Sequence, residues 1–304
     1  MRNAFRMSAA AVQVLGAAAA IPAAGEIFSE NLYNRALGEK PERETQNRAT
    51  TKTEDAHVKY AILSDVHSNP DALERALEDA REHAAEKVVC LGDVVGYGPD
   101  PARAVELVRN SCDVVLMGNH DAAVAGLEDT ECYLGSAADG IRRNREQLSE
   151  DDLAWLKSLP YVHSEAGFDC AHGSFANADQ FRYTQDAFDA KASLRLSEAR
   201  FQFVGHTHVS AVWDWDECLW DRFPSPVKNG GFVAEPGHRY VVNVGSVGYP
   251  RVEAASVYCL FDSSAGSVEF RRLPFDAASY AESLRSHGVE IPHWLENPQG
   301  GGWR

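Results

Sequence analysis

Aspartate, asparagine and histidine residues recur in five short motifs between residues 65 and 208. In chain order, the motifs are Asp65-Val66-His67, Gly92-Asp93, Gly118-Asn119-His120-Asp121, His172 within Ala171-His172-Gly173-Ser174, and Gly205-His206-Thr207-His208. A single histidine is more often a satisfied loop or core residue than a ligand. Five such motifs together, three of them following a glycine, are very improbable by chance and predict one functional site.

Together the motifs supply imidazole nitrogens, carboxylates and an amide oxygen, but no thiolate. This donor set suits manganese, iron, zinc, nickel or cobalt better than calcium or a copper electron-transfer site. A carboxylate such as Asp93 can bridge two ions, and two ions about 3.5–4 Å apart can activate a shared water and neutralise charge on a phosphoryl group. We therefore expect two divalent ions, manganese first, with iron, zinc, nickel, cobalt or magnesium as alternatives, and hydrolysis without a protein nucleophile.

The first three motifs follow segments that have the pattern of buried strands. Alternating apolar and amphipathic runs predict strands at 58–63, 87–91 and 113–117, with helices at 71–83 and 101–109 between them. This order implies a parallel, helix-covered sheet, which places ligand sites at the carboxyl ends of its strands. An extended backbone would point Asp65 and His67 toward one shared metal, and the same reasoning applies to His206 and His208.

The second half of the chain has a different pattern. Residues 136–159 are expected to be helical with a break near Ser149, and a helix at 276–287 closes the domain. The strands expected in this half are 168–171, 201–204, 211–215, 240–244, 257–261 and 267–273. The last four of these strands predict a second, more antiparallel sheet. Trp213 and Trp215 would share one face of a strand and could stack a base or line an interface, but we favour packing within their own hairpin.

The motif order D-x-H, G-D, G-N-H-D, H and G-H-x-H resembles the calcineurin-like metallophosphoesterase superfamily. Within it, the small bacterial and archaeal phosphodiesterase-like branch is similar at Ser64-Asp65-Val66-His67-Ser68-Asn69, at Gly92-Asp93 through Pro99-Asp100-Pro101, and at Asn243-Val244-Gly245-Ser246-Val247-Gly248. The resemblance extends over residues 58–287. It implies an α/β (α+β) fold, namely a four-layer α-β-β-α sandwich of two mixed sheets with helices outside.

The resemblance also implies a role for each motif residue. One metal would be held by Asp65, His67, Asp93 and His208, and the second by Asp93, Asn119, His172 and His206. His120 would be the general acid beside the scissile bond, with Asp121 orienting its ring. The implied reaction is hydrolysis of phosphodiesters or nucleotide-like phosphates by a metal-activated water.

Three further residues near the motifs are candidates for substrate contact. Asn69 precedes Pro70 and makes a good helix N-cap, which is the role we favour for it. Tyr97 lies at the tip of the 96–99 turn and could border the pocket, although the glycines there could equally just let the chain turn. Arg251 follows the Gly245-Ser246 loop, where a substrate phosphate and a surface ion pair are equally reasonable partners.

The composition limits the partners of the protein. A net charge of −16 and a pI near 5.1 disfavour nucleic acid or an anionic membrane surface, so we expect a small-molecule phosphoester substrate and no stable nucleic-acid partner. Six cysteines without C-x-x-C spacing indicate free thiols in a reducing compartment. We expect a cytoplasmic protein without a membrane span, and the sequence leaves a homo-oligomer open.

The N-terminal part differs from the rest of the chain. Residues 1–25 contain an Ala-rich stretch after Arg2 and Arg6, and the protein would be exported if this stretch acts as a signal peptide; we favour an unstructured extension. Residues 38–57 are polar and have the composition of a linker. We therefore expect an N-terminal extension at 1–57, a metallophosphoesterase domain at 58–290 and a flexible tail at 291–304.

Two other functions are open to a chain of this superfamily. A catalytically silent, protein-binding scaffold would be indicated by broken ligands or a missing His120, and this chain retains them all. A phosphomonoesterase of the serine/threonine protein phosphatase type carries one arginine shortly after G-D and another just before G-N-H. This chain has Gly96-Tyr97 and Met117 at those places, which favours a phosphodiesterase.

Overall fold

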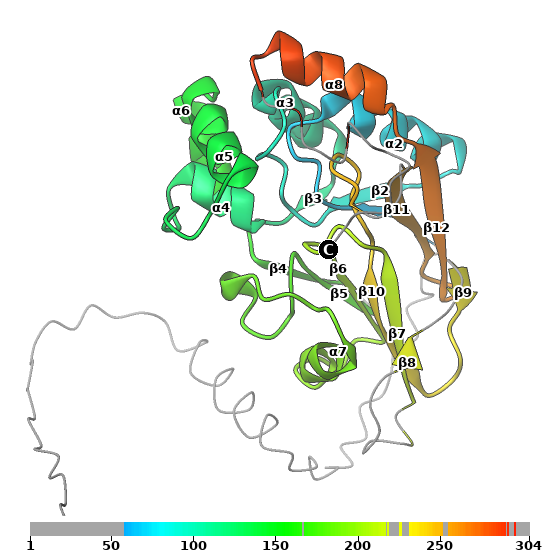
Figure 1. The fold of residues 1–304 in the computed structure, drawn as a ribbon. Helices are drawn as coiled ribbons and strands as arrows, with labels where there is room; N and C mark the ends of the chain where they lie inside the picture. Colours follow the sequence, from blue (N-terminus) through cyan, green and yellow to red (C-terminus); the bar gives the residue numbers. More distant parts are fainter. Residues whose placement is uncertain are drawn as a thin grey trace, which may run out of the picture. The chain divides into compact units, whose positions relative to one another are not determined.

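The fold comes from a computed structural model that describes residues 58–165, 167–216, 218, 225–226, 231–251, 255–289, 291 and 295. The predicted N-terminal extension, with its signal-like segment and linker, lies outside the described residues. The described strands form two six-stranded sheets that face each other (Figure 1).

The first sheet has the strand order β3-β2-β1-β11-β12-β9. The strands β1, β2 and β3 are parallel to one another. The strands β11, β12 and β9 extend the sheet from β1 through antiparallel pairs. The strands are β1 (Lys59–Leu63), β2 (Lys87–Cys90), β3 (Val114–Val115), β11 (Ala255–Asp262), β12 (Ser267–Pro274) and β9 (Gly231–Val233). The parallel part carries the first three sequence motifs at its carboxyl edge.

The second sheet has the order β4-β5-β6-β10-β7-β8. Here β5, β6 and β10 are parallel, and the outer strands pair antiparallel. The strands are β4 (Val162–Glu165), β5 (Phe168–Ala171), β6 (Phe201–Val204), β10 (His238–Asn243), β7 (Ala211–Asp216) and β8 (Ser225–Pro226). The remaining two motifs follow β5 and β6, so both sheets place motif residues at the ends of parallel strands.

The prediction that the last four strands belong to a second, more antiparallel sheet was wrong for two of them. β11 and β12 join the first sheet beside β1, whereas β7 and β10 join the second sheet beside β6. The cause is that apolar patterning specifies which face of a strand is buried and not which strand is its neighbour. The predicted strand 113–117 is also shorter, at Val114–Val115, and β4 was not predicted.

Helices cover the outer faces of both sheets, which gives the four predicted layers (Figure 1). Around the first sheet are α2 (Pro70–Glu82), α3 (Pro101–Ser111), α4 (Asn119–Ala125), α5 (Ser136–Gln147), α6 (Glu150–Lys157) and α8 (Ala277–Ser286). The second sheet is covered by α7 (Ala187–Leu194), which follows the short 3₁₀ turn η1 (Ala178–Gln180). Between the sheets lies an aromatic core that includes Phe168, Phe203 and Phe261.

Both crossover helices of the first sheet begin at a capped residue next to a motif. The Asn69 side chain accepts a hydrogen bond from the Ala72 amide, Pro70 is the first helical residue of α2, and the helix buries Leu73 and Leu77 against the sheet. The start of α3 at Asp100 is built the same way. Burial of one such leucine contributes about 1.5–3 kcal/mol, so these helices fix the loops that carry the ligands.

The two tryptophans of β7 are part of the protein core. Trp213 and Trp215 are 7% and 1% exposed and pack with Ala190 and Leu194 of α7. Base stacking by these two rings is therefore excluded, because α7 covers the face of the sheet to which they belong. Among the described helices, none is long and apolar enough to cross a membrane.

The predicted tail begins at residue 291, and two of its residues contact the core around the first sheet. Ile291 packs against this core and Leu295 is buried within it. The other residues of the predicted tail lie outside the described part of the chain.

Candidate metal centre

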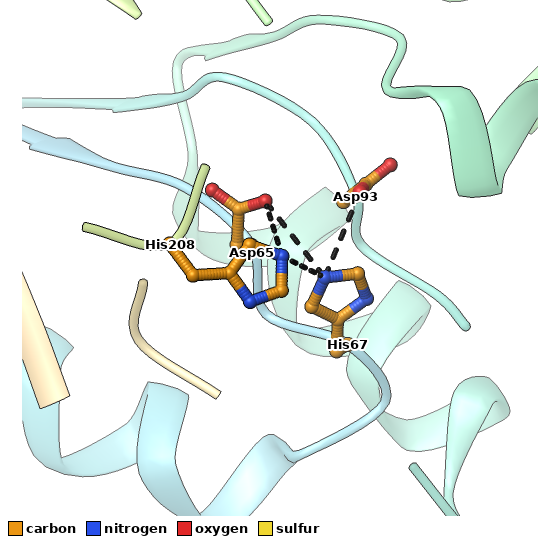
Figure 2. A group of neighbouring side chains, drawn as sticks. All are labelled: Asp65, His67, Asp93 and His208. Carbon is orange, nitrogen blue, oxygen red and sulfur yellow. Dashed lines mark hydrogen bonds and ion pairs between the residues drawn. The ribbon is translucent and has the colours of Figure 1, made fainter. Parts of the chain in front are cut away.

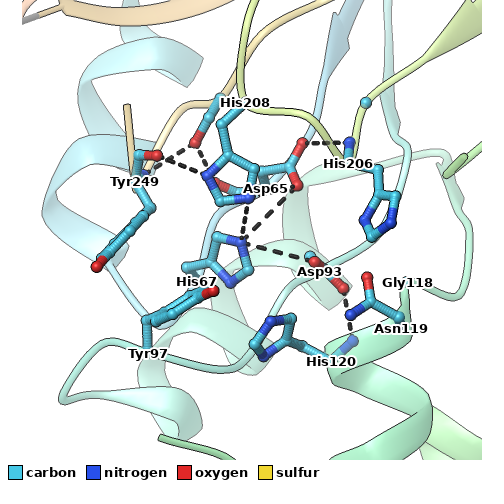
Figure 3. Close-up of polar contacts among 12 residues, drawn as sticks. Asp65, His67, Asp93, Tyr97, Gly118, Asn119, His120, His206, His208 and Tyr249 are labelled. Atoms are coloured by element: carbon cyan, nitrogen blue, oxygen red, sulfur yellow. Dashed lines mark hydrogen bonds and ion pairs between the residues drawn. The ribbon is translucent and has the colours of Figure 1, made fainter. Parts of the chain in front are cut away.

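The motif residues meet where the carboxyl ends of the two sheets face each other. Asp65 and His67 follow β1, Asp93 follows β2, and Asn119 is the first residue of α4 beyond β3. From the second sheet, His172 follows β5 while His206 and His208 follow β6. Backbone hydrogen bonds such as Asp65 N to Gly92 O (3.0 Å) and Gly205 N to His172 O (2.8 Å) join neighbouring loops. Figure 3 shows most of these side chains converging on one point.

The first group of side chains consists of Asp65, His67, Asp93 and His208, whose potential ligand atoms all lie within 4.8 Å of one another (Figure 2). His67 Nε2 is 3.0 Å from His208 Nε2, and Asp65 Oδ1 is 3.3 Å from the latter nitrogen. All four residues are buried. Their arrangement matches the first of the two predicted metal sites.

The tautomers of this group leave lone pairs that face each other. His67 Nδ1 donates to Val95 O (3.1 Å) and His208 Nδ1 donates to Tyr249 O (2.7 Å), so both Nε2 atoms keep their lone pairs. Burial holds the pKa of both histidines well below the ordinary value, which leaves no proton between the two rings. Two opposed lone pairs beside a buried carboxylate fit a divalent cation that they ligate together.

The second group consists of Asp93, His172 and His206, with Asn119 beside them. His172 Nε2 is 3.2 Å from both Asn119 Oδ1 and His206 Nδ1, while His172 Nδ1 donates to Leu91 O (3.1 Å). Burial alone would lower the pKa of His172, but the Asp93 and Asp65 carboxylates raise it to about 9. A proton on His172 therefore supplies, in the metal-free protein, part of the positive charge that this acidic site requires.

Asp93 is the residue that both groups share. Its Oδ2 atom is 3.6 Å from His67 Nε2 and 3.3 Å from His172 Nε2, whereas Oδ1 accepts from the His120 amide (2.8 Å). Asp93 Oδ2 and Asp65 Oδ1 are buried without a hydrogen bond among the described residues, and protonated His172 offers only an ion pair to Asp93 Oδ2 at 3.3 Å. A cation bound between these oxygens and the neighbouring imidazoles would compensate their charge, so the geometry fits one bridging carboxylate between two ions.

The backbone around the ligands is left-handed rather than extended. Positive φ angles occur at five ligand residues, namely Asp65 (56°), His67 (48°), Asp93 (52°), His206 (67°) and His208 (61°). The sequence-based argument assumed an extended backbone that points both ligands of a pair to one metal, and this assumption was wrong. Asp65 and His67 do share a group, but His206 and His208 belong to different groups. Each such residue costs about 1–3 kcal/mol, which is typical of functional sites.

His120 lies beside the two groups, and its ring is 4.9 Å from the His67 ring and 4.7 Å from the Tyr97 ring (Figure 3). The prediction that Asp121 orients this ring was wrong. Both Asp121 oxygens accept backbone amides, from Val95 (3.1 Å) and Gly118 (3.0 Å), and His120 Nδ1 has no hydrogen-bond partner among the described residues. Asp121 instead caps α4 and ties it to the loop after β2.

The three candidate substrate residues have different surroundings. Both polar atoms of Asn69 are used inside the protein, as the helix cap and as a donor to Gly248 O (3.0 Å), which confirms its predicted structural role. Tyr97 stacks on Tyr249 at 4.3 Å and accepts a hydrogen bond from Arg251 Nη2 (3.3 Å). Burial lowers the pKa of four histidines of the site, and the Arg251 charge adds a smaller effect in the same direction; they are His67, His120, His206 and His208. Arg251 and Tyr97 therefore belong to the site, and Asn69 supports it from the helix start.

Two tyrosines at the site were not found from the sequence. The Tyr133 hydroxyl accepts from Asn119 Nδ2 (3.0 Å), which turns Asn119 Oδ1 toward His172. Tyr183 stacks on the ring of His206 at 3.9 Å and an interplanar angle of 12°. Both lie in irregular segments without a recognisable motif, so no sequence signal identifies them.

Comparisons with known proteins agree with this site. The family model of the calcineurin-like phosphoesterases matches residues 58–221, which is more than half of the chain, and the chain belongs to this family. The family is a metal-dependent hydrolase superfamily, and the clustered histidines and aspartates of the site are groups that could bind metals.

One of two relatives extends the match over most of the chain. The uncharacterised protein MJ0912 of Methanocaldococcus jannaschii is 30% identical over 239 residues, which are 77% of this chain and 94% of that protein. A symmetrical bis(5′-nucleosyl)-tetraphosphatase of Aromatoleum aromaticum is 27% identical over 46% of this chain and 53% of its own length.

Solved structures show the same architecture. A metallophosphoesterase from Sphaerobacter thermophilus has 31% identity and a TM-score of 0.69, covering 81% of this chain and 100% of that one. The hypothetical protein PH1004 from Pyrococcus horikoshii OT3 shares the fold, with 20% identity, a TM-score of 0.62 and coverage of 78% and 96%.

Proposed function

We propose that the protein is a phosphoesterase with two divalent metal ions, manganese first, that hydrolyses phosphodiesters or nucleotide-like phosphates. The observation that carries the proposal is Asp93 Oδ2. This buried oxygen lies between His67 Nε2 (3.6 Å) and His172 Nε2 (3.3 Å) and accepts no hydrogen bond among the described residues. One oxygen in contact with two nitrogen-rich groups is the arrangement that a dinuclear centre requires.

The residues of the chain hold this centre in a fixed geometry. Asp65, His67, Asp93 and His208 would bind one ion, and Asp93, Asn119, His172 and His206 the other. Carbonyl acceptors fix the tautomers of His67, His172 and His208, so that each directs Nε2 to its ion. When bound, the two ions supply an activated water and positive charge for phosphoryl transfer.

His120 is the proposed general acid. Its Nδ1 is packed against Gly96, where a Cβ would lie 2.3 Å from that nitrogen, which leaves Nε2 to exchange a proton with the leaving oxygen. Burial lowers the pKa of His120, so its ring is neutral near pH 7 before substrate binds. A phosphoryl anion beside the ring favours the protonated form, because a neighbouring opposite charge raises the pKa of an imidazole.

Phosphodiesters are preferred over monoesters in this proposal because the site is poor in positive side chains. Met117 and Tyr97 stand where the protein phosphatases carry arginines, and Arg251 is the guanidinium that acts on the histidines of the site. A diester carries one negative charge fewer than a monoester dianion and needs fewer cations. The similarity to a bis(5′-nucleosyl)-tetraphosphatase supports nucleotide-like substrates. The buried Trp213 and Trp215 give no support to this preference.

The proposal is tested on the full chain loaded with Mn²⁺. kcat/KM is compared for bis(4-nitrophenyl) phosphate and 4-nitrophenyl phosphate, and then for a nucleotide diester and the matching monoester. The diester is expected to have the higher kcat/KM in both pairs. Monoesters ahead in both pairs would move the assignment to a phosphatase, and no hydrolysis in either pair would favour the catalytically silent scaffold.

A further inference from the structure

Tyr183 is an exposed aromatic residue next to the second group of candidate ligands, and neither the motifs nor the family assignment gives it a role. Its ring stacks on His206 with a centroid distance of 3.9 Å and an interplanar angle of 12°. The residue is 44% exposed even though this stack covers one face of the ring. The part of the side chain that the stack leaves uncovered is therefore accessible to a ligand.

The loop between β5 and α7 fixes the position of Tyr183. The Ser174 amide donates to Arg182 O (2.7 Å), and Gly173 approaches the same carbonyl so closely that a Cβ there would lie 2.5 Å from it. Phe181 anchors the loop in the core, where its ring lies 5.7 Å from Tyr161. The backbone before Tyr183 is therefore held, and the stack on His206 positions its ring.

Two other tyrosines at the centre, Tyr97 and Tyr133, are less exposed than Tyr183. Tyr97 is half-buried, with its ring stacked on Tyr249 (4.3 Å) and in edge contact with His67 (4.8 Å). Tyr133 contacts the His120 ring at 5.4 Å and holds the Asn119 amide through its hydroxyl. Tyr183 differs from both, because it is exposed and its ring stacks on a candidate ligand.

We infer that Tyr183 forms a stacking subsite for a planar aromatic group on the substrate, such as a nucleobase or an aryl ring. The inference rests on the proposed phosphodiesterase function and names its substrate class: a phosphodiester that bears an aromatic substituent. The His120 ring contacts His67, Tyr97 and Tyr133, whereas the Tyr183 ring stacks on His206 of the second group. With His120 as the proposed general acid for the leaving group, Tyr183 is assigned to the substituent that stays on the phosphorus atom.

The test compares two diesters that share a leaving group and differ in the retained substituent: thymidine 5′-(4-nitrophenyl phosphate) and methyl 4-nitrophenyl phosphate. The readout is the ratio of kcat/KM for the thymidine diester to that for the methyl diester. The Mn²⁺-loaded full chain is compared with Tyr183→Leu, which removes the π-face but keeps apolar cover on His206, and with Tyr183→Phe, which keeps the π-face. Phe188→Leu, at an exposed aromatic residue of α7, is the matched control.

The ratio should fall by about 5- to 150-fold in Tyr183→Leu, the range that stacking of a base on an aromatic side chain contributes. It should stay at the wild-type value in Tyr183→Phe and Phe188→Leu. An unchanged ratio in Tyr183→Leu, with both substrates slowed alike, would show that the ring only supports His206 and would overturn the subsite. A wild-type protein that hydrolyses neither diester would instead overturn the proposed function, and the subsite with it.

Discussion

Substitution of Asp93 by asparagine tests the bridging carboxylate most directly. The His120 amide donates to Asp93 Oδ1 at 2.8 Å, so the side chain of Asp93→Asn must keep an oxygen at that position. Its NH₂ group then takes the position of Oδ2, between His67 Nε2 and His172 Nε2. An amide nitrogen there offers hydrogen atoms rather than a lone pair to a cation, and the negative charge is lost as well. Asp93→Asn is therefore expected to weaken both metal sites together.

The expected magnitude follows from the loss of one direct bond to each ion. Loss of an outer hydrogen-bond partner of a metal ligand typically costs 10–100-fold in affinity, so loss of the ligand itself should cost at least about 100-fold, or about 2.7 kcal/mol, for each ion. The assay is equilibrium dialysis against graded free Mn²⁺, with metal per chain measured by atomic emission and folding followed by circular dichroism.

Asp65→Asn provides the matched comparison. Asp65 Oδ2 accepts from the His206 amide (3.1 Å), so the new NH₂ would face only the group of His67 and His208. One ion should then be lost and the other retained. Asp129→Asn, at an exposed carboxylate in the loop after α4, controls for the charge change alone. Two ions bound to Asp93→Asn with wild-type affinity would refute the assignment of Asp93 as the bridge.

Three further predictions concern the surroundings of the two ions. His120→Ala should keep both ions, because the backbone amide of residue 120, and not its side chain, donates to Asp93. The variant should hydrolyse alkyl esters about 10²–10⁴-fold more slowly and lose less activity on nitrophenyl esters. An equal loss on both kinds of ester would contradict a general acid. Tyr133→Phe should lower the affinity of the second site for its ion about 10–100-fold in dialysis and leave the affinity of the first site unchanged. Tyr161→Phe is the control. Unchanged affinity at the second site would show that Tyr133 is not a positioning residue. Burial raises the pKa of Asp65 to about 7, and Asp93 helps to raise that of His172 to about 9 against the effect of burial, so metals must displace these protons. Metal affinity should then fall as pH falls from 9 to 6, with proton release on binding at pH 7 in calorimetry across buffers; pH-independent binding would contradict this coupling.

The motif loops and the helices that follow them could be predicted from the sequence because their signals are local. Asn69 with Pro70 and Asp100 with Pro101 mark helix starts, and the structure places caps at both. The ligand residues come from loops that follow short buried strands, and parallel order alone brings the loops of one sheet to the same edge. The grouping of ligands into two sites came from the family resemblance, and the same groups occur in the structure.

The features that could not be predicted depend on contacts between distant segments. His206 and His208 both have left-handed φ angles that nothing in Gly205-His206-Thr207-His208 signals, so their spacing alone predicted one shared metal where the structure has two groups. Asp121 appeared free to orient His120, but the Val95 amide, 26 residues earlier, occupies one of its oxygens. Tyr133 and Tyr183 reach the site from irregular loops, where residue type carries no positional information.

The glycines of the motifs lie where loops from different strands come into close contact. A Cβ on Gly205 would lie 2.1 Å from Ser64 Oγ and 2.7 Å from Asp65 Oδ2, and one on Gly118 would lie 2.1 Å from Asp93 Oδ1. Each glycine therefore lets one loop approach a carboxylate carried by another, and Gly205 does so between the two sheets. Since interiors are close-packed and deform little, a larger residue at either glycine would push these loops apart. Both groups of ligands draw residues from both sheets, so their geometry depends on this close approach.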